Sequence, residues 1–194
     1  QLYLDFIYKA MQKKLLKSVV SSLFLLLIAP LVLFHFLFLT FSEHGLFVFS
    51  VQLLSLIPGK IGSYFRVAFN RMTMTHCHPE TVIGFATLFS QKDTEIFQGV
   101  YIGPQCNIGM CRLGKNTLIA SGVHIMSGSK QHNFKDIDSP IQQQGGVYEK
   151  IEIGEDSWVG NGCLIMANIG KKCIIGAGSV VTRSEEHTSE LQSQ

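Results

Sequence analysis

The sequence predicts a mainly β protein, a parallel β-helix of hexapeptide repeats, preceded by a helical hydrophobic N-terminal segment. Three observations lead to this prediction. Of the 18 glycines, 15 lie between Gly84 and Gly178. Aliphatic residues recur every six positions through the same half of the chain. Before it, Val19 to Leu39 form a run of 21 residues without a formal charge.

Length and composition narrow the class of protein. The 194 residues suffice for one ordinary domain with an appendage and are too few for two full-sized enzyme domains. With 15% charged and 46% apolar residues, the chain is neither a disordered tail nor a nucleic-acid arm. A net charge of +2 gives no support for a polyanionic partner, so no nucleic acid is expected. The five cysteines lack any C-x-x-C spacing, which argues against a disulfide-stapled secreted module.

Residues 1–57 are interpreted as a hydrophobic, membrane-associated helical segment. As a helix, the uncharged run is long enough to cross a hydrocarbon core of roughly 30 Å. A polar break at Ser42–Gly45 separates it from a shorter apolar run, Leu46–Ile57. Basic residues on both sides of this hydrophobic block predict that both ends face the cytoplasm, at the inner membrane.

Several topologies fit that segment. Pro30 lies midway through the first run and favours a kink, which suits a hairpin that enters and leaves on one face. Two tilted or shortened spans are the other membrane form. A buried core hairpin and a secretory signal are the alternatives, and the signal fits poorly because no A-x-A-like site follows the run.

Residues 58–82 form a basic-aromatic connector that contains the stretch PGKIGSYFRVAFNRM. Its aromatic and arginine side chains suit a short amphipathic helix at the membrane interface. Equally, the connector suits a cap over the first turn of the next domain. Both interpretations rest on the residues Tyr64, Phe65, Arg66, Phe69 and Arg71.

From residue 83 to 182 the chain follows a six-residue period, which fits a parallel β-helix and neither an α-helix nor a plain strand. In each hexad a large aliphatic side chain points into the core, a small residue fills the corner, and the glycine that often follows the aliphatic residue allows the turn backbone. The predicted aliphatic positions are Ile83, Phe89, Ile96, Ile102, Ile108, Leu113, Ile119, Ile125, Val147, Ile153, Val159, Ile165, Ile169, Ile175 and Val181. The predicted small positions are Thr87, Val100, Cys106, Thr117, Val123, Ser129, Ser157, Cys163, Cys173 and Ser179. Three of these are cysteines, which we expect to be buried and reduced.

Two segments, SGSKQHNF and DSWVGNGCLIMANIGKKCIIGAGSVVT, give the chain a resemblance to a known family. With the hexads around them they resemble the hexapeptide-repeat acyltransferases, and within these the galactoside, maltose and sugar O-acetyltransferases. The resemblance extends over about Ile83 to Thr182. It implies a left-handed β-helix, a homotrimer with clefts between subunits, acetyl-CoA as acyl donor, and a sugar or glycan acceptor.

The resemblance also implies a general base in the loop that interrupts the hexads at residues 131–146, where the histidine is His132. Transfer from a thioester requires that a proton leave the acceptor hydroxyl, and a neutral imidazole suits that task near pH 7. A solvent-exposed loop histidine without a task is the alternative. His124 lies inside a hexad and is interpreted as a packing or cleft-lining residue.

The remaining site residues follow from the same resemblance. Trp158, Gly160, Ala177 and Gly178 are expected to line the coenzyme, although the fold alone also demands small residues in the turns. Three polar residues are expected near the acceptor: Asn107, Ser127 and Ser129.

No metal is predicted. Cys77 lies between His76 and His78, but no second ligand cluster follows at a matching spacing. Carbonic anhydrases of this fold need three converging histidines, and only His124 and His132 occur late in the repeats.

Residues 183–194, RSEEHTSELQSQ, depart from the family's usual last coil and terminal helix. They resemble a translated sequencing adapter, so we interpret them as non-native and give His187 no function.

The sequence therefore predicts an acetyl-CoA-dependent O-acetyltransferase acting on a sugar or glycan. A non-enzymatic, membrane-tethered β-helix scaffold and an N-acetyltransferase acting on an amino sugar are the alternatives.

Overall fold

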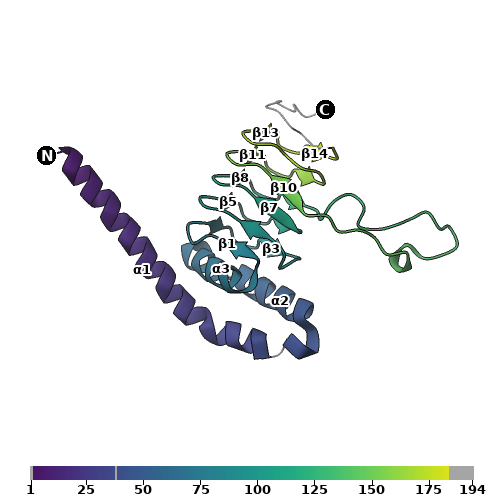
Figure 1. The fold of residues 1–194 in the computed structure, drawn as a ribbon, viewed down its shortest axis with the longest axis horizontal. Helices are drawn as coiled ribbons and strands as arrows, with labels where there is room; N and C mark the ends of the chain where they lie inside the picture. The colour runs from purple at the N-terminus through teal and green to yellow at the C-terminus, as the bar shows by residue number, and fades with distance from the viewer. Residues whose placement is uncertain (1, 38, 184–194) are drawn as a thin grey trace.

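The computed structural model describes residues 2–37 and 39–183, and it has a column of short strands standing on a helical base (Figure 1). The predicted left-handed parallel β-helix and the helical hydrophobic segment before it are both confirmed. The predicted adapter tail lies outside the described residues, apart from Arg183.

Three helices form the base: α1 (Leu2–Leu37), α2 (Leu39–Ser55) and α3 (Gly59–Thr73). The polar stretch Ser42–Gly45, predicted to separate two apolar runs, lies within α2 and does not interrupt it. Helix α1 runs on through Pro30. By length and apolar composition, Ile7–Leu37 is one helix that could cross a membrane, and 17% of its most apolar window is buried. That low burial disfavours the core-hairpin alternative.

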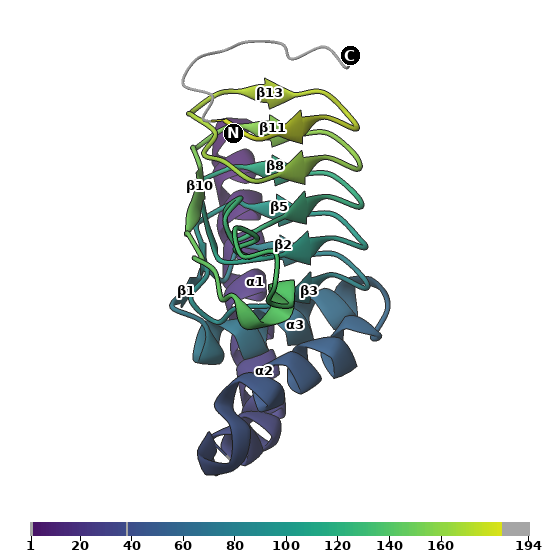
Figure 2. The same ribbon diagram turned by 90° about the vertical axis from the view of Figure 1, so that its right-hand side faces the viewer.

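The column consists of three parallel sheets, here called sheets A, B and C, whose strands stack from coil to coil (Figure 2). Sheet A holds β1 (His76–Cys77), β4 (Glu95–Ile96), β7 (Cys111–Leu113) and β10 (Ile151–Ile153) in that order. Sheet B holds β2 (Val82–Ile83), β5 (Tyr101–Ile102), β8 (Leu118–Ile119), β11 (Trp158–Val159) and β13 (Ile174–Ile175). Sheet C holds β3 (Leu88–Phe89), β6 (Asn107–Ile108), β9 (His124–Ile125), β12 (Leu164–Ile165) and β14 (Val180–Val181).

Each two-residue strand turns its second side chain into the column and its first outward. The inward side chains are the predicted aliphatic residues, and 14 of the 15 are at most 2% exposed. Burial of each such side chain is worth about 1.5–3 kcal/mol. The one wrong position is Val147, which is 53% exposed, because the loop still continues there and the inward register resumes at Ile151. Ser129 is likewise exposed, contrary to its predicted corner position, since it already belongs to the loop.

The glycines directly after the aliphatic residues have a different role from the predicted one. The positive φ angles occur two residues later, at Ala86, Gln105 and their equivalents, so those glycines do not make the left-handed turn. They allow close stacking of coils instead: a Cβ at Gly84 would lie 2.4 Å from the carbonyl carbon of Gly103. Glycine is needed there because neighbouring backbones touch.

Arg66 joins the base to the column. Its guanidinium is buried and donates hydrogen bonds to the carbonyl oxygens of Leu54 (3.0 Å) and Ile57 (2.8 Å), at the end of α2. It also donates to the carbonyl oxygen of Ile83 in β2, at 3.0 and 3.2 Å. Helix α3 therefore covers the first coil, and its position below β1 and β3 is visible in Figure 1.

Helix α1 packs against α3 through one of its sides. The Phe24 ring stacks on Tyr64 at 5.1 Å and meets Phe65 edge-on at 4.8 Å. Farther along, Ile28 and Val32 are buried. The opposite side of α1 is exposed and apolar, with the residues Leu16, Val19, Leu23, Leu26, Leu27, Phe34 and Leu37.

Candidate active site

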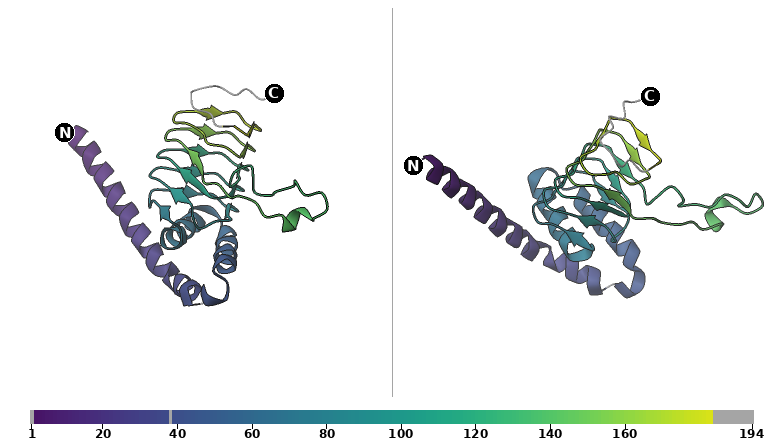
Figure 3. Two further views of the ribbon diagram at one scale, coloured as in Figure 1. Left: turned by 45° about the vertical axis from the view of Figure 1, so that its right-hand side comes forward. Right: turned by 45° about the horizontal axis from the view of Figure 1, so that its top comes forward.

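A long loop leaves the column between β9 and β10 and extends well away from it (Figure 3). Its two arms are joined by backbone hydrogen bonds from Val147 N to the Lys130 oxygen (2.8 Å) and from Asn133 N to the Gly145 oxygen (2.9 Å). At the tip, residues Ile141–Gln143 form a 3-10 turn. The loop is thus a two-armed projection from the corner between sheets C and A.

Lys150 fixes the returning arm to the column. Its ammonium group contacts the carboxylates of Asp93, at 2.5 Å, and Glu95, at 3.0 Å. These hydrogen bonds raise the pKa of Lys150, and the bond from Lys150 lowers the pKa of Asp93. Both carboxylates belong to the coil of β4, two coils below β10, so the root of the loop is held by charge as well as by the backbone.

His132 lies in the outgoing arm with its side chain exposed. Within residues 2–37 and 39–183, its imidazole makes no hydrogen bond or ion pair. An exposed imidazole that makes no such contact can take a proton from a substrate that approaches the loop.

The three candidate acceptor residues occupy different places. Asn107 points outward from sheet C, where it pairs with His124 on the neighbouring strand. Ser127 is buried at the loop root, and its Oγ accepts a hydrogen bond from the Met110 N–H at 2.8 Å. Ser129 is exposed two residues farther on. All three therefore lie on sheet C or at the root of the loop.

His124 is exposed on the outward face of sheet C, so the core-packing interpretation of this residue is wrong. The signal was present in the sequence, because the residue before each inward aliphatic side chain points outward. His124 thus becomes a second histidine that is accessible to substrate on the side of the column that carries the loop root.

The candidate coenzyme residues lie on another side of the column. Trp158 points outward from sheet B and is 50% exposed. Gly160 follows in the turn toward sheet C, where an added Cβ would lie 2.6 Å from the Ala177 nitrogen. Ala177 and Gly178 are exposed in the next turn, and Gly178 has a φ of +74° with open space around it. Gly160, which is buried, and Ala177 are thus direct neighbours, and the exposed small residues are those of the outer turn, Ala177 and Gly178.

One chain does not bring the two groups together. Trp158 and the turn glycines belong to sheet B and its corner with sheet C, whereas His132 projects from the corner between sheets C and A. The whole outward face of sheet C separates them. A site that uses both groups needs a second copy of the chain.

A further feature was missed at the sequence level. The outward positions of sheet B form a continuous apolar row, here called the sheet B row: Val82, Tyr101, Leu118, Trp158 and Ile174. Each of these side chains is 42–50% exposed. The corresponding positions on sheet A are polar or charged, with His76, Glu95, Arg112 and Glu152. The sequence could have predicted this row, because each of its members directly precedes an inward aliphatic residue.

The cysteine chemistry is that of a packed core. Burial raises the pKa of the Cys77 and Cys111 thiols to about 12, so both are protonated and poor metal ligands. Cys77 points into the column and His76 points out of it, so the two cannot share one metal ion. Among the described residues, no group of three His, Cys, Asp or Glu side chains is arranged to hold a metal.

No protein-family model and no curated protein matches the chain. Among solved structures, it is similar to a mutant of AntD, an N-acyltransferase from Bacillus cereus in complex with dTDP-4-amino-4,6-dideoxyglucose and coenzyme A. The identity is 16% and the TM-score 0.41, over 60% of this chain and 77% of that chain.

It is also similar to serine acetyltransferase from Neisseria gonorrhoeae in complex with serine, at 20% identity and a TM-score of 0.25. That match covers 64% of this chain and 44% of the other. A serine acetyltransferase isoform from Entamoeba histolytica, in complex with cysteine, matches at 19% identity and a TM-score of 0.22, over 81% of this chain and 52% of that one.

Proposed function

We propose that the chain is an acyltransferase that moves an acetyl group from acetyl-CoA to a hydroxyl of a sugar or glycan, with His132 as general base. The observation that carries the proposal is the exposed imidazole on an anchored loop, in a column that also presents a wall of small residues beside Trp158.

The chemistry follows from the residues. His132 takes the proton of the acceptor hydroxyl as that oxygen attacks the thioester carbonyl. The C–S bond then breaks, and the leaving coenzyme A sulfur receives the proton from the imidazolium, so that ester and free thiol are released. Asn107 and Ser129 hydrogen-bond the acceptor near the loop root and orient it toward the imidazole. The narrow thioester arm fits the open turns of Ala177 and Gly178, where no side chain blocks the backbone, and it packs along the exposed indole of Trp158.

The active unit in this proposal is a homotrimer, because one chain holds its two groups of site residues on different sides. A neighbouring copy covers the sheet B row and carries its own loop toward this chain's turns. Burial of five half-exposed apolar side chains supplies the driving force for that contact. Replacement of Leu118 by Asp, in the centre of the row, tests the interface: light scattering should report a smaller particle.

We further propose that the base binds the cytoplasmic face of the inner membrane from one side. Helix α3 packs along residues 21–35 of α1, and the first coil is joined to α3. If α1 crossed the bilayer upright, it would draw Arg66, Arg71 and that coil to hydrocarbon depth, where charged groups are costly. The exposed apolar side of α1 instead suits insertion along the interface.

The experiment that tests the reaction is thiol release from acetyl-CoA with candidate sugars, by the unaltered chain and by His132→Ala. Loss of a general base costs about 10²–10⁴-fold in rate. His124→Ala is the matched control, because that imidazole is also exposed and should leave the rate nearly unchanged. If His124→Ala abolishes the reaction and His132→Ala does not, the base is assigned wrongly.

Two measurements distinguish this proposal from the alternatives, N-acetylation and a non-enzymatic scaffold. Release of thiol with amino sugars alone would indicate N-acetylation, since the hexads set no preference between hydroxyl and amine. Calorimetry that shows no heat of binding for acetyl-CoA with a folded oligomer would instead favour the scaffold.

A further inference from the structure

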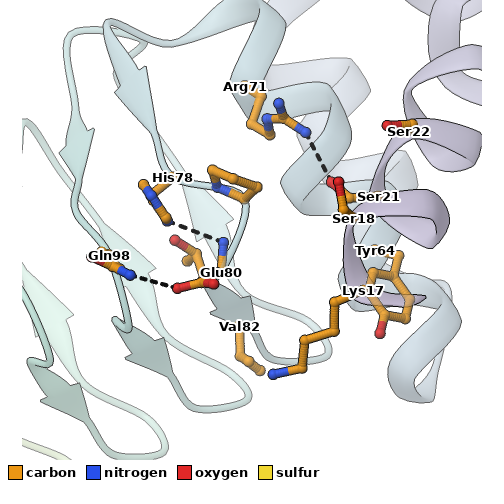
Figure 4. Close-up of a pocket in the computed structure, with 12 residues that line it drawn as sticks. Lys17, Ser18, Ser21, Ser22, Tyr64, Arg71, His78, Glu80, Val82 and Gln98 are labelled. Carbon is orange, nitrogen blue, oxygen red and sulfur yellow. Dashed lines mark hydrogen bonds between the residues drawn. The ribbon is translucent and has the colours of Figure 1, made fainter. Parts of the chain in front are cut away.

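A cavity of about 420 Å³ lies between α1, α3 and the turn that leads into β2 (Figure 4). Its walls come from Lys17, Ser18, Ser21 and Ser22 of α1 and from Tyr64 and Arg71 of α3. The first coils contribute the opposite wall: His78, Pro79, Glu80, Thr81, Val82 and Gln98. None of the residues assigned above to acyl transfer lines this cavity.

Two cations flank the cavity. In Figure 4, Arg71 lies at one end and Lys17 at the other, with Ser18 and Ser21 of α1 between them. Arg71 donates one hydrogen bond, from Nη1 to the Ser21 Oγ at 2.9 Å, and this bond orients its fork along the cavity wall. Within the described part of the chain, Lys17 has no ion-pair partner. Lys17 and most of the guanidinium donors of Arg71 are thus available to an anion.

The opposite wall holds one anionic group, the Glu80 carboxylate, which faces Gln98. The Glu80 carboxylate accepts a hydrogen bond from the Gln98 amide at 2.7 Å. The His78 Nδ1 accepts the Glu80 backbone N–H at 3.2 Å, which assigns the ring proton to Nε2 and makes His78 another donor. The hydroxyls of Ser18, Ser22 and Tyr64 can donate as well. The cavity therefore offers more donors than acceptors, and the two cations Lys17 and Arg71 outweigh the one carboxylate of Glu80.

We infer that this cavity binds the phosphate group of a phosphoester. An Arg guanidinium and a Lys ammonium with nearby hydroxyls make the charge-assisted hydrogen bonds that phosphate oxygens accept best. A neutral sugar fits less well, because its hydroxyls need acceptors as well as donors. The volume exceeds that of a bare phosphate ion and leaves room for a small organic group attached to it.

The phosphate has two chemical sources, a lipid headgroup and a soluble phosphoester. Lys17 is the last charged residue before the long uncharged stretch of α1, so the cavity lies where the helix changes from basic to apolar. If α1 lies along the interface as proposed above, Lys17 is at headgroup level, where an anionic lipid headgroup can reach the cavity.

The experiment uses the purified full chain in detergent micelles, with calorimetric titration of glycerol 3-phosphate. In parallel, the chain is sedimented with phosphatidylcholine vesicles that do or do not contain phosphatidylglycerol. The variants are Lys17→Gln and Arg71→Gln, each of which should weaken phosphate binding about tenfold. Lys13→Gln is the matched control: it removes the same charge from the same helix, one turn away from the cavity, and should change the affinity less than about twofold.

Each outcome of the titration and the sedimentation either supports or overturns the inference. Saturable binding of glycerol 3-phosphate that depends on Lys17 supports the cavity with a soluble ligand. Binding only to vesicles with phosphatidylglycerol, again dependent on Lys17, supports it with a lipid. The inference is overturned if neither probe binds, or if Lys13→Gln weakens binding as much as Lys17→Gln does.

Two further controls separate fold and function. Should Arg71→Gln not fold, Lys17→Gln still tests the site, because Lys17 is exposed and makes no contact that the fold needs. Ser21→Ala removes the hydrogen bond to Arg71 without removing charge, and should weaken binding less than Arg71→Gln. Acetyl transfer to a soluble sugar should be unchanged in Lys17→Gln, so failure of this site and failure of the proposed reaction give different results.

Discussion

The column and the base of this protein are stabilised in different ways. In the column, one inward side chain per strand is repeated from coil to coil, so Ile83, Ile102 and Ile119 occupy equivalent places in sheet B. In the base, contacts occur once: one stacked pair at Phe24 and one buried guanidinium at Arg66. Stability in the column is therefore spread over many similar contacts, whereas the contacts of the base differ from one another.

The two regions also differ in what they leave exposed. The column keeps a charged face on sheet A and an apolar row on sheet B, both set by the outward residue that precedes each inward aliphatic side chain. The base exposes apolar side chains along the whole side of α1 that α3 does not cover. These two separate apolar surfaces are the basis of the two proposed contacts, with a second copy at the column and with a lipid surface at the base.

The strongest test of this comparison is to remove Arg66, whose buried side chain makes several hydrogen bonds between the two regions. Arg66→Met keeps much of the apolar stem but leaves the carbonyl oxygens of Leu54, Ile57 and Ile83 without their donor. We expect a loss of about 3–5 kcal/mol in the free energy of unfolding, measured by denaturant titration.

Arg112→Met is the control for that measurement. Its side chain is 49% exposed and its ion-pair distances to Glu95 and Glu152 are 3.7 and 3.9 Å, so the cost should stay below about 1 kcal/mol. Equal losses in the two variants would show that the buried contacts of Arg66 are not the link between base and column.

A substitution in the core of the column tests how its inward side chains stabilise it. Ile108 in β6 is fully buried, and Ile108→Ala should cost about 2–5 kcal/mol in unfolding free energy because it leaves a cavity. The adjacent Asn107 points outward, so Asn107→Ala should cost less than about 0.5 kcal/mol. If Asn107→Ala proved as destabilising as Ile108→Ala, the alternation of β6 would be wrong.

The smallest expected effect concerns the ion pair that anchors the loop. Lys150 lowers the pKa of Asp93 in the folded state, so the pair stabilises the fold above the ordinary carboxyl pKa of about 3.9. That stabilisation is lost as the pH falls through the lowered folded-state pKa. Because Asp93 is half exposed, the effect should stay below about 1 kcal/mol.

Asp93→Asn tests that pair through the pH profile of stability. The variant should show a flatter loss of unfolding free energy between about pH 5 and pH 2 than the unaltered chain. Identical acid profiles for the two proteins would mean that Lys150 does not hold the loop through Asp93.

Most of the column was predictable from the sequence, because each hexad carries the same information and errors at one position do not shift the next. The prediction was wrong at Val147 and Ser129, which both belong to the loop, where the repeat gives no register. It was also wrong about why glycine follows the aliphatic residues, since close approach between coils is invisible in one coil's sequence.

The placement of site residues was predictable only in part. That His132 lies in a loop follows from the interrupted period, and that Asn107 points outward follows from alternation. The separation of Trp158 from His132 across sheet C could not be predicted from the sequence, because it depends on the number of residues in each turn between sheets. The cavity beside Lys17 was hidden for a similar reason: its walls come from three segments that are far apart in the chain.

The sequence alone determined the period of the repeat, the residues that fill the column and the apolar character of the first helix, since each of these follows from local patterns of hydrophobicity. The tertiary structure decided how Arg66 closes the first coil, which surfaces remain uncovered, and where cations from distant helices meet. These features depend on contacts between segments that no local pattern encodes.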